Sequence, residues 1–366
     1  MAASLRERDL DALLVTSAVN LRYLTGFTGS SGLALIAADG ADGDAAGGRA
    51  GLGAHRFITD FRYRTQASEQ VPDAFEREVV LDNLLEGAAG ALERTDGRLG
   101  FDEKSLTVAQ HTRLRELLGE RWELVPGAEA LERLRAVKDA GEIARIRAAS
   151  ELADEALRAV LEAGLAGRTE REVALELEVA MRRRGAAGPS FPTIVAAGAH
   201  AALPHAQPRD REIPPDVLVT IDWGALHEGY CSDCTRTYAS GEGITARARE
   251  IYELVRSVQE QAASAVRAGP TGPELDAVAR APIEAAGHGE QFGHGLGHGV
   301  GLEVHESPRM SRTAPDEPLR AGNVVTVEPG VYLPGELGVR IEDLLVVREG
   351  GHEVLTSLPR DLTVVS

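Results

Sequence analysis

This chain of 366 residues has few cysteines, no long apolar run and no excess of positive charge. Its only cysteines, Cys231 and Cys234, cannot make a disulfide framework, which excludes the small disulfide-stapled secreted proteins. The longest apolar stretches, such as Gly32–Ala38, have about seven residues, whereas a membrane-spanning helix needs ~20. Because Met1–Leu14 also lacks the apolar region of a signal peptide, we predict a cytoplasmic protein with no membrane partner.

Acidic residues outnumber basic residues by 57 to 39, which gives a formal net charge of −18. Such a chain has no general attraction for phosphate backbones or anionic lipids, so we expect no nucleic-acid partner. Hydrophobic residues make up 43% of the chain, which is ample for buried cores. At ~150 residues per domain, the length predicts two domains.

The hydrophobic patterns change character near residue 130, and we predict domains at 1–130 and 131–366. In the first, short β-rich runs alternate with helical patterns, which is typical of a small α/β sheet. Within it, Ala38–Ala54 has no periodicity and is predicted to be a mobile hairpin insertion. The second is predicted to be α+β, with helices against an antiparallel sheet. Its expected helices are Glu142–Leu165, Thr169–Arg183, Ala246–Ala268 and Pro273–Ala286, and the second of them is predicted to open with Thr169 and Glu172 as a capping box. Its main expected strands are Ile194–Ala197, Leu218–Asp222, Gly229–Ala239, Val324–Val327 and Val339–Val347.

Carboxylates inside apolar strands are the most informative residues, because a buried carboxylate without a partner costs several kcal/mol. Asp222 ends the apolar run Leu218–Asp222, and Asp233 follows eleven residues later. Gly224 and Gly229 mark a chain reversal between them, so a hairpin would bring both side chains to one face. Either aspartate alone could be an ordinary strand-end residue. Together they require a cation.

Three further candidate ligands follow along the chain. His298 lies in a glycine-rich segment, 293–301, which cannot form a stable helix and so differs from the helical H-E-x-x-H motif. Glu328 ends an apolar strand before Pro329. Glu342 is expected on the same strand face as Arg340, which would orient it. Asp343 is expected on the opposite face, as a surface or hydrogen-bonding residue.

Four carboxylates and one imidazole are too many ligands for one transition-metal ion, but they suit two divalent ions that share bridging carboxylates. Four negative charges also balance four positive charges. Oxygen-rich ligation predicts manganese first, with cobalt, zinc or iron as alternatives that the sequence does not separate.

In this order and these contexts, the five residues resemble the metal-binding set of the "pita-bread" metallopeptidases, the family of aminopeptidase P, prolidase and creatinase. The resemblance covers nearly the whole chain, since residues 23–31 and 58–63 are similar to the creatinase-type N-terminal domain. It implies a pita-bread catalytic domain preceded by a smaller α/β domain. It also implies that Asp233 and Glu342 bridge the two ions, that Asp222 binds one, and that His298 and Glu328 bind the other.

The resemblance further implies catalytic roles for four residues: His205, His294, His305 and Glu328. Glu328 would carry a proton from the nucleophile to the leaving nitrogen, and His205 or His305 would donate to the developing oxyanion. Any one of these histidines, taken alone, could instead be an ordinary loop or strand-end residue.

The function implied is hydrolysis of the bond between an N-terminal residue and a following proline, so the partners are peptides with proline in second position. We expect an aminopeptidase P-like enzyme, with an Xaa-Pro dipeptidase as the alternative and a non-catalytic binding protein on the same fold as a third. A thiol-redox role for Cys231 and Cys234 is disfavoured, because residues three apart on a strand face opposite sides. We also predict a homodimer or larger assembly, in which the N-terminal domain narrows a neighbouring active site.

Overall fold

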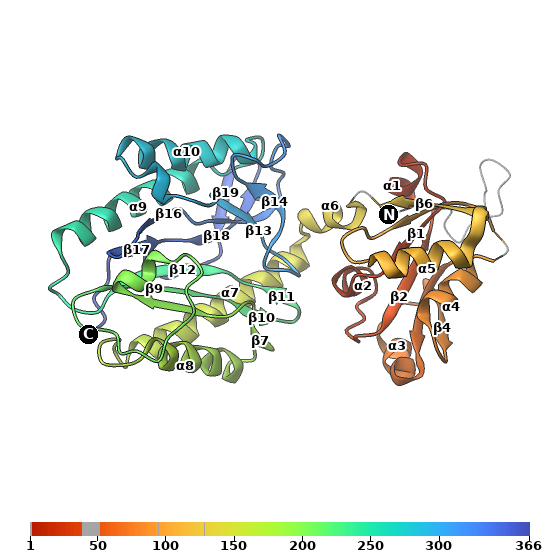
Figure 1. Ribbon diagram of the computed structural model, residues 1–366, viewed down its shortest axis with the longest axis horizontal. Coiled ribbons are helices and arrows are strands. Elements are labelled where there is room, and N and C mark those ends of the chain that lie inside the picture. Colours follow the sequence, from red (N-terminus) through yellow and green to blue (C-terminus); the bar gives the residue numbers. More distant parts are fainter. Residues whose placement is uncertain (1, 39–51, 94, 128) are drawn as a thin grey trace. The chain divides into compact units, whose positions relative to one another are not determined.

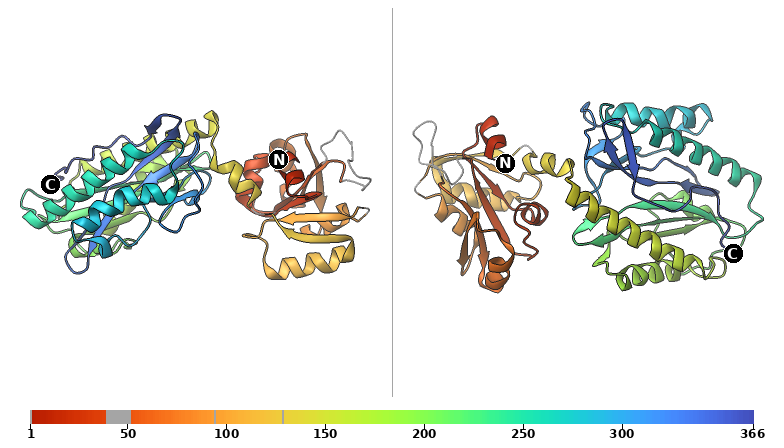
Figure 2. Two further views of the ribbon diagram at one scale, coloured as in Figure 1. Left: turned by 90° about the horizontal axis from the view of Figure 1, so that it is seen from above. Right: turned by 180° about the vertical axis from the view of Figure 1, so that it is seen from behind.

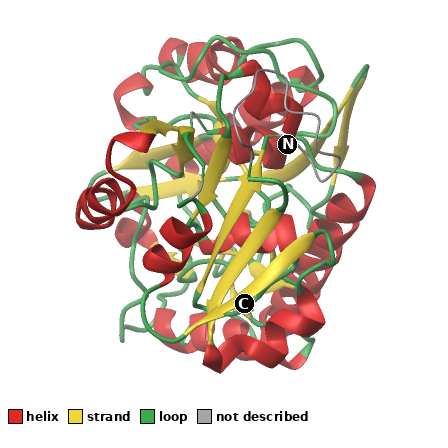
Figure 3. Cartoon of the chain, turned by 90° about the vertical axis from the view of Figure 1, so that its right-hand side faces the viewer, coloured by secondary structure: helices red, strands yellow, loops and turns green. Residues whose placement is uncertain are grey.

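This computed structural model describes residues 2–38, 52–93, 95–127 and 129–366. The chain divides into two compact units, Met1–Leu134 and Arg135–Ser366, here called the N-terminal unit and the C-terminal unit. Helices and strands occur in both (Figure 1, Figure 3). Most of the expected insertion at 38–54 lies outside the described residues.

The N-terminal unit is built on a six-stranded mixed sheet with the strand order β4-β3-β2-β1-β5-β6. Strand β2 runs antiparallel to β1 and β3, whereas β1 with β5, β5 with β6 and β3 with β4 are parallel pairs. This confirms the predicted α/β character. The elements are α1 (Ala2–Glu7), β1 (Ala12–Val15), α2 (Ala18–Thr25), β2 (Gly32–Ala37), β3 (His55–Asp60), α3 (Arg64–Gln70), β4 (Phe75–Val80), α4 (Leu84–Ala91), β5 (Gly97–Phe101), α5 (Val108–Leu118) and β6 (Trp122–Pro126).

Both faces of this sheet are apolar because successive side chains of a strand point to opposite sides. Leu14 and its cross-strand partner Leu35 pack with residues of α4 and α5. Leu13 and its partner Ile36 pack on the other face, with residues of α1, α2 and α3. Figure 2 shows helices on both sides of the sheet.

The C-terminal unit consists of long helices and antiparallel strand pairs, as predicted. Helix α6 (Ala130–Ala136) leads into it from the N-terminal unit. Its elements are α7 (Ala140–Leu161), α8 (Glu170–Arg183), β7 (Gly188–Pro189), β8 (Ile194–Ala197), β9 (Leu218–Trp223), β10 (Ala225–His227), β11 (Tyr230–Cys231), β12 (Cys234–Ala239), α9 (Ala246–Ala265), α10 (Gly272–Ala285), β13 (Gly297–Gly299), β14 (Glu306–Met310), β15 (Val324–Val327), β16 (Gly330–Leu333), β17 (Leu337–Arg340), β18 (Asp343–Arg348) and β19 (Gly351–Val354).

The two largest hydrophobic cores of this unit lie between its helices and strands. One joins α7 and α8 to the sheet β12-β9-β8, with the fully buried Trp223 among its members. The other joins α9 and α10 to β15, β17 and β18. In Figure 1 the two helix pairs lie on opposite sides of the strands. The strands therefore form an interior layer in which charged side chains stand out.

The local prediction at α8 is confirmed in detail. Thr169 accepts a hydrogen bond from the backbone of Glu172 at 3.1 Å, and the Glu172 carboxylate accepts one from the Thr169 backbone at 2.7 Å. This reciprocal capping box fixes the start of the helix.

Two expected strands are interrupted, and this prediction of continuous strands was wrong. The run Gly229–Ala239 divides into β11 and β12, and the run Val339–Val347 belongs to β17 and β18. Asp233 lies in the first break and Glu342 in the second. The hydrophobic pattern continues through both breaks, which is why the alternation of residues did not reveal them.

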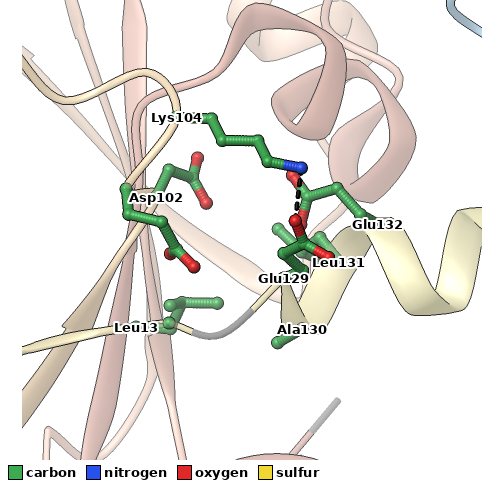
Figure 4. A pocket seen from close by; sticks show the side chains of 9 residues that line it. Leu13, Asp102, Lys104, Glu129, Ala130, Leu131 and Glu132 are labelled. Atoms are coloured by element: carbon green, nitrogen blue, oxygen red, sulfur yellow. Dashed lines mark ion pairs between the residues drawn. The ribbon is translucent and has the colours of Figure 1, made fainter. Parts of the chain in front are cut away.

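Figure 4 shows a pocket of the N-terminal unit that has several acidic side chains. These groups have partners within the chain: Asp102 accepts the backbone N–H of Thr16 at 3.0 Å, Glu132 accepts Asn20 Nδ2 at 2.8 Å, and Lys104 pairs with Glu129. These three carboxylates are thus each held by a partner within the chain. Separately, among the described residues, no helix combines the length and apolar character that crossing a membrane requires.

Candidate metal centre

The five predicted ligands lie at strand ends and strand breaks of the C-terminal unit: Asp222 on β9, Asp233 between β11 and β12, His298 on β13, Glu328 after β15, and Glu342 between β17 and β18. In the antiparallel pair of β9 and β12, Thr235 lies directly opposite Asp222. The Glu342 N–H donates to the Thr235 carbonyl at 3.0 Å, which fixes the second strand break against β12. The Glu328 N–H donates to the Leu296 carbonyl at 2.9 Å.

Ligand atoms from these segments lie close together. His298 Nε2 is 3.2 Å from Glu328 Oε1 and 3.7 Å from Asp233 Oδ2. One ligand atom each from Asp233, His298 and Glu342 lie within 4.8 Å of one another. The charge of Asp222 acts on both Asp233 and Glu342. The structure therefore brings all five residues into one cluster.

The electrostatics of this cluster call for added positive charge. Burial, followed by neighbouring carboxylates, raises the pKa of Asp233 and of Glu342 well above their ordinary values. Burial also raises the pKa of Asp222, against the opposing effect of Arg340. Glu328 differs: burial raises its pKa, but the hydrogen bond and charge of His298 outweigh burial and hold the pKa at about 2. Four carboxylates thus share one arginine and one imidazole.

The donor set fits divalent metal ions. Asp222 Oδ2 accepts Arg340 Nη2 at 2.6 Å, whereas Asp222 Oδ1 is buried and has no hydrogen-bond partner among the described residues. Such a buried oxygen is costly unless something else binds it. Carboxylate oxygens together with one imidazole nitrogen are ligands suited to manganese, cobalt, iron or zinc ions.

The His298 ring is oriented to present Nε2 to the carboxylates. Its Nδ1 lies 3.1 Å from the Gly299 carbonyl, which can only accept, so Nδ1 carries a proton. The backbone around His298 lies in a narrow slot between neighbouring strands. A Cβ atom on Gly297 would lie 2.1 Å from the Thr326 carbonyl oxygen, and one on Gly299 would lie 2.3 Å from the Ser307 carbonyl oxygen. Both positions therefore require glycine.

His294 has the same ring orientation but different surroundings. Its Nδ1 lies 2.8 Å from the Gly295 carbonyl, and its Nε2 lies 3.0 Å from the hydroxyl of Tyr332. Because Tyr332 occupies Nε2, this histidine has no free nitrogen for a metal. Burial lowers the pKa of His294 and keeps the ring neutral. The geometry is consistent with the predicted separation of His294 from the ligands.

Helix α10 holds the glycine-rich segment that carries these histidines. Arg280 pairs with Asp276 and donates to the carbonyl oxygens of Phe292 and His294, both at 2.8 Å. Asp276 in turn accepts the Leu296 N–H at 3.1 Å. The part of this segment before β13, which belongs to no helix or strand, is thereby fixed by two buried side chains of one helix.

Arg340 contacts the cluster differently from the prediction, which paired it with Glu342. Its guanidinium binds Asp222, the Tyr332 hydroxyl at 2.8 Å and Thr235 Oγ1 at 3.0 Å. Glu342 is held by Thr235 Oγ1 at 2.7 Å. The strand break after Arg340 ends the regular alternation, so Arg340 and Glu342 do not share a continuous strand face. The position of Thr235, two residues after Asp233, could have indicated from the sequence that it faces the same cluster. No local feature of the sequence indicates that Tyr332 contacts the cluster.

The remaining predicted histidines lie beside the cluster. The His305 ring is 4.3 Å from that of His298, centroid to centroid, and the side chain is exposed. His205 is exposed in the loop after residues 198–202, and its charge contributes to lowering the pKa of His305, behind burial and His298. Asp343 is buried and hydrogen-bonded, so its alternative placement at the surface was wrong.

Cys231 and Cys234 are buried free thiols on either side of the first strand break. Burial raises the pKa of Cys231 to about 12 and that of Cys234 well above its ordinary value. Since thiolate is the reactive form, both cysteines are inert packing residues here.

Comparison with known proteins agrees with this geometry. The family model for metallopeptidase family M24 matches residues 144–349, and that for the creatinase/prolidase N-terminal domain matches residues 1–137. The chain therefore belongs to metallopeptidase family M24, a family of hydrolases that use divalent metals. The predicted pita-bread fold with a creatinase-type N-terminal domain is confirmed.

Individual relatives cover most of the chain. The peptidase YqhT of Bacillus subtilis is 42% identical over 357 residues, 97% of this chain and 96% of that protein. An Xaa-Pro dipeptidase of Pyrococcus furiosus is 45% identical over 235 residues, 64% of this chain and 67% of that protein. Among solved structures, an Xaa-Pro dipeptidase from Bacillus anthracis has a TM-score of 0.91 at 36% identity, covering 99% of this chain and 98% of that one. An X-Pro aminopeptidase from Thermotoga maritima has a TM-score of 0.86 at 36% identity, covering 99% and 100%.

Proposed function

We propose that this metallopeptidase is an Xaa-Pro dipeptidase that uses two divalent ions, manganese first. The convergence of five ligand side chains with an unpartnered Asp222 oxygen carries the metal part of the proposal. The names of the Pyrococcus furiosus and Bacillus anthracis relatives favour the dipeptidase over the aminopeptidase expected from the sequence. The Thermotoga maritima neighbour keeps the X-Pro aminopeptidase as the second candidate.

In this proposal Asp222, Asp233, His298, Glu328 and Glu342 would together hold the two ions, with the division between them that the family resemblance implies. When bound, the ions would polarise a substrate carbonyl and lower the pKa of an attacking water. The chain's own groups do the remaining work. Arg340 and Thr235 keep Asp222 and Glu342 oriented through the hydrogen bonds described above.

Proton transfer and charge stabilisation fall to the side chains around the cluster. Glu328, ionised and adjacent to His298, can accept a proton and return it to the leaving proline nitrogen. His205 and His305 are exposed beside the cluster, so either can donate to the developing oxyanion. His294 stays neutral and is held by Tyr332, so it can contact the substrate without binding metal.

A dipeptidase must also recognise the free carboxylate of the proline, and Arg309 is suited to this role. It lies on β14 directly opposite His298 on β13. Its charge reaches His305 and adds to the lowering of the pKa of His305, after burial and His298. Arg309 is exposed and makes no ion pair with any described residue. An unpaired guanidinium at this position would bind a carboxylate by charge-assisted hydrogen bonds.

A substrate panel tests the proposal. The manganese-loaded protein should cleave Ala-Pro, cleave Ala-Pro-Ala far more slowly and leave Ala-Ala-Ala intact. Arg309→Ala should raise KM for Ala-Pro by ~10–100-fold, equivalent to the ~1.5–3 kcal/mol of a charge-assisted hydrogen bond. Arg312→Ala removes another exposed arginine of the same region and should have no effect.

Each result of the panel has a distinct meaning. Efficient cleavage of Ala-Pro-Ala would establish the aminopeptidase instead, and equal rates on Ala-Ala-Ala would reject proline specificity. Oligomeric state and cellular location stay predictions. Light scattering that finds a fully active monomer would reject the predicted homo-oligomer.

A further inference from the structure

A buried cluster of ion pairs lies where the chain begins the C-terminal unit. Arg135 Nη2 is 2.6 Å from Glu306 Oε2 and 2.7 Å from Glu303 Oε2. Lys138 Nζ is 2.6 Å from the second carboxylate oxygen of Glu306. The side chain of Lys138 is 1% exposed, and that of Glu306 is 6% exposed. Two residues at the start of the unit thus hold a carboxylate that follows His305 directly.

Stability alone does not explain this cluster. Removing charges from water offsets most of the attraction in a buried ion pair, so a hydrophobic replacement is often neutral or stabilising. Burial accordingly lowers the pKa of Lys138, against the opposing charge and hydrogen bond of Glu306 and the charge of Glu142. The chain has two lysines, Lys104 and Lys138, and the second is the buried one. Since the ion pairs add little stability, their main effect is to fix the position of the Glu306 carboxylate.

The segment between β13 and β14, residues 300–305, contains no helix or strand. It is tied down at its start, where the Val300 N–H donates to the Val324 carbonyl at 3.0 Å and the Gly301 carbonyl accepts the Cys231 N–H at 2.8 Å. At its other end the Glu306 carboxylate folds back so closely that a Cβ atom on Gly301 would lie 2.4 Å from Glu306 Oε1.

We propose that Glu306 is a positioning residue for His305, and that Lys138 and Arg135 hold it in place. The ion pairs anchor the far end of segment 300–306, and this keeps the exposed His305 ring against His298. The proposal rests on the proposed function, because there His305 contacts the reacting atoms. A group held within about an ångström of its productive position can contribute a factor of ~100 to the rate.

The chain offers a matched pair of variants for the test, because its two lysines differ in burial. Lys138→Met should lower kcat for Ala-Pro by ~10–100-fold and leave KM and the content of two metals per chain unchanged. Lys104→Met removes the exposed lysine of the N-terminal unit and should leave kcat unchanged. Glu306→Gln removes the charge at constant shape and replaces Lys138→Met if that variant does not fold.

A double-mutant cycle shows whether the effect passes through His305. If it does, Lys138→Met combined with His305→Ala should be no slower than His305→Ala alone. Losses that multiply, or a Lys138→Met variant with wild-type kcat beside an impaired His305→Ala variant, would overturn the positioning role and leave the proposed function standing.

Hydrogen–deuterium exchange tests the anchor independently of activity. Residues 300–306 should exchange faster in Lys138→Met than in the wild type, while α9 and α10 keep their protection. Unchanged exchange in that segment would overturn the inference. A wild-type protein that cleaves no Xaa-Pro peptide would instead reject the proposed function, and the exchange measurement would still report on the anchor.

Discussion

Two buried acidic regions lie on either side of one peptide bond, and they differ in how their charge is neutralised. Glu342 belongs to the proposed metal centre, where burial and the carboxylates of Glu328 and Asp222 raise its pKa. Its neighbour Asp343 pairs with Arg236 at 2.7 Å and with Arg360. Burial raises the pKa of Asp343, but these two arginines outweigh burial and lower it.

The difference distinguishes structural from functional carboxylates. Asp343 also accepts hydrogen bonds from Gln259 and Thr356, both at 2.7 Å, so the chain itself satisfies this side chain. The metal centre has four carboxylates with Arg340 as their arginine partner. A buried carboxylate cluster that the chain leaves short of positive charge is therefore the one that we propose binds cations.

Asp233→Asn should give the largest effect on activity. A neutral amide is a poor bridge between two ions, so hydrolysis of Ala-Pro should fall by more than the ~10–100-fold that losing an outer partner costs. The metal-free variant should not be less stable than wild type, because it loses one of four crowded carboxylates. Metal analysis and kcat/KM measure these effects. If the variant bound two ions and had wild-type turnover, the assignment of Asp233 as a metal ligand would be wrong.

Asp343→Asn should instead lower stability and leave metal binding intact. It leaves Arg236 and Arg360 without their buried counter-charge, so the free energy of unfolding should fall by ~3–5 kcal/mol. Each folded molecule should still bind two ions. Urea denaturation of the metal-free protein, with metal analysis of the folded fraction, makes the comparison. If the variant lost metal while its stability was unchanged, Asp343 would have to be reassigned as a residue of the metal centre.

His298 and His294 have similarly oriented rings but are expected to differ in metal binding. His298→Ala should weaken metal binding and give a species with one ion at limiting metal, because the free Nε2 is lost. His294→Ala should keep both ions and lower kcat, since its Nε2 contacts Tyr332. Calorimetric titration with Mn²⁺ separates the two variants. Equal loss of metal in both would contradict the assignment.

A smaller effect is expected in the pH dependence of stability. The pKa values of Asp233 and Glu342 are raised above their ordinary 3.8 and 4.5, so above these values the metal-free fold binds more protons than the unfolded chain. Stability of the metal-free protein therefore falls as pH rises. Because metal ions displace these protons, the increase in Tm on adding Mn²⁺ should grow between pH 5 and pH 7.5. An increase independent of pH would contradict the raised pKa values.

The sequence was most informative where a residue type conflicts with its surroundings. Asp222 after four apolar or neutral strand residues, and Glu328 before a proline, stand out from the hydrophobic pattern, and the strands that carry them were placed to within a residue or two. The capping box of α8 was equally readable, because it depends on residues three apart. A local sequence pattern reveals a charged residue within an apolar strand, and the proposed metal ligands Asp222 and Glu328 are residues of this kind.

Contacts between distant segments were not readable in the same way. Arg340 binds Asp222 across 118 residues, and Arg135 binds Glu306 across 171. No local pattern indicates these pairings, and Ile341, which lies in the second strand break, likewise looks like an ordinary strand residue. Tyr332 likewise reaches His294 only because β16 turns back after Pro329.

The backbone slot around His298 limits how this enzyme can be redesigned. Gly297 and Gly299 have no room for even one methyl group, because carbonyl oxygens of the neighbouring strands occupy that space. A library intended to change metal preference should therefore keep both glycines fixed and vary side chains that contact the proposed ligands, such as Thr235, which binds Glu342, or Thr326, which binds Glu328. Variation at the two glycines would mostly sample misfolded chains, and the evolvable part of the site lies in its side chains.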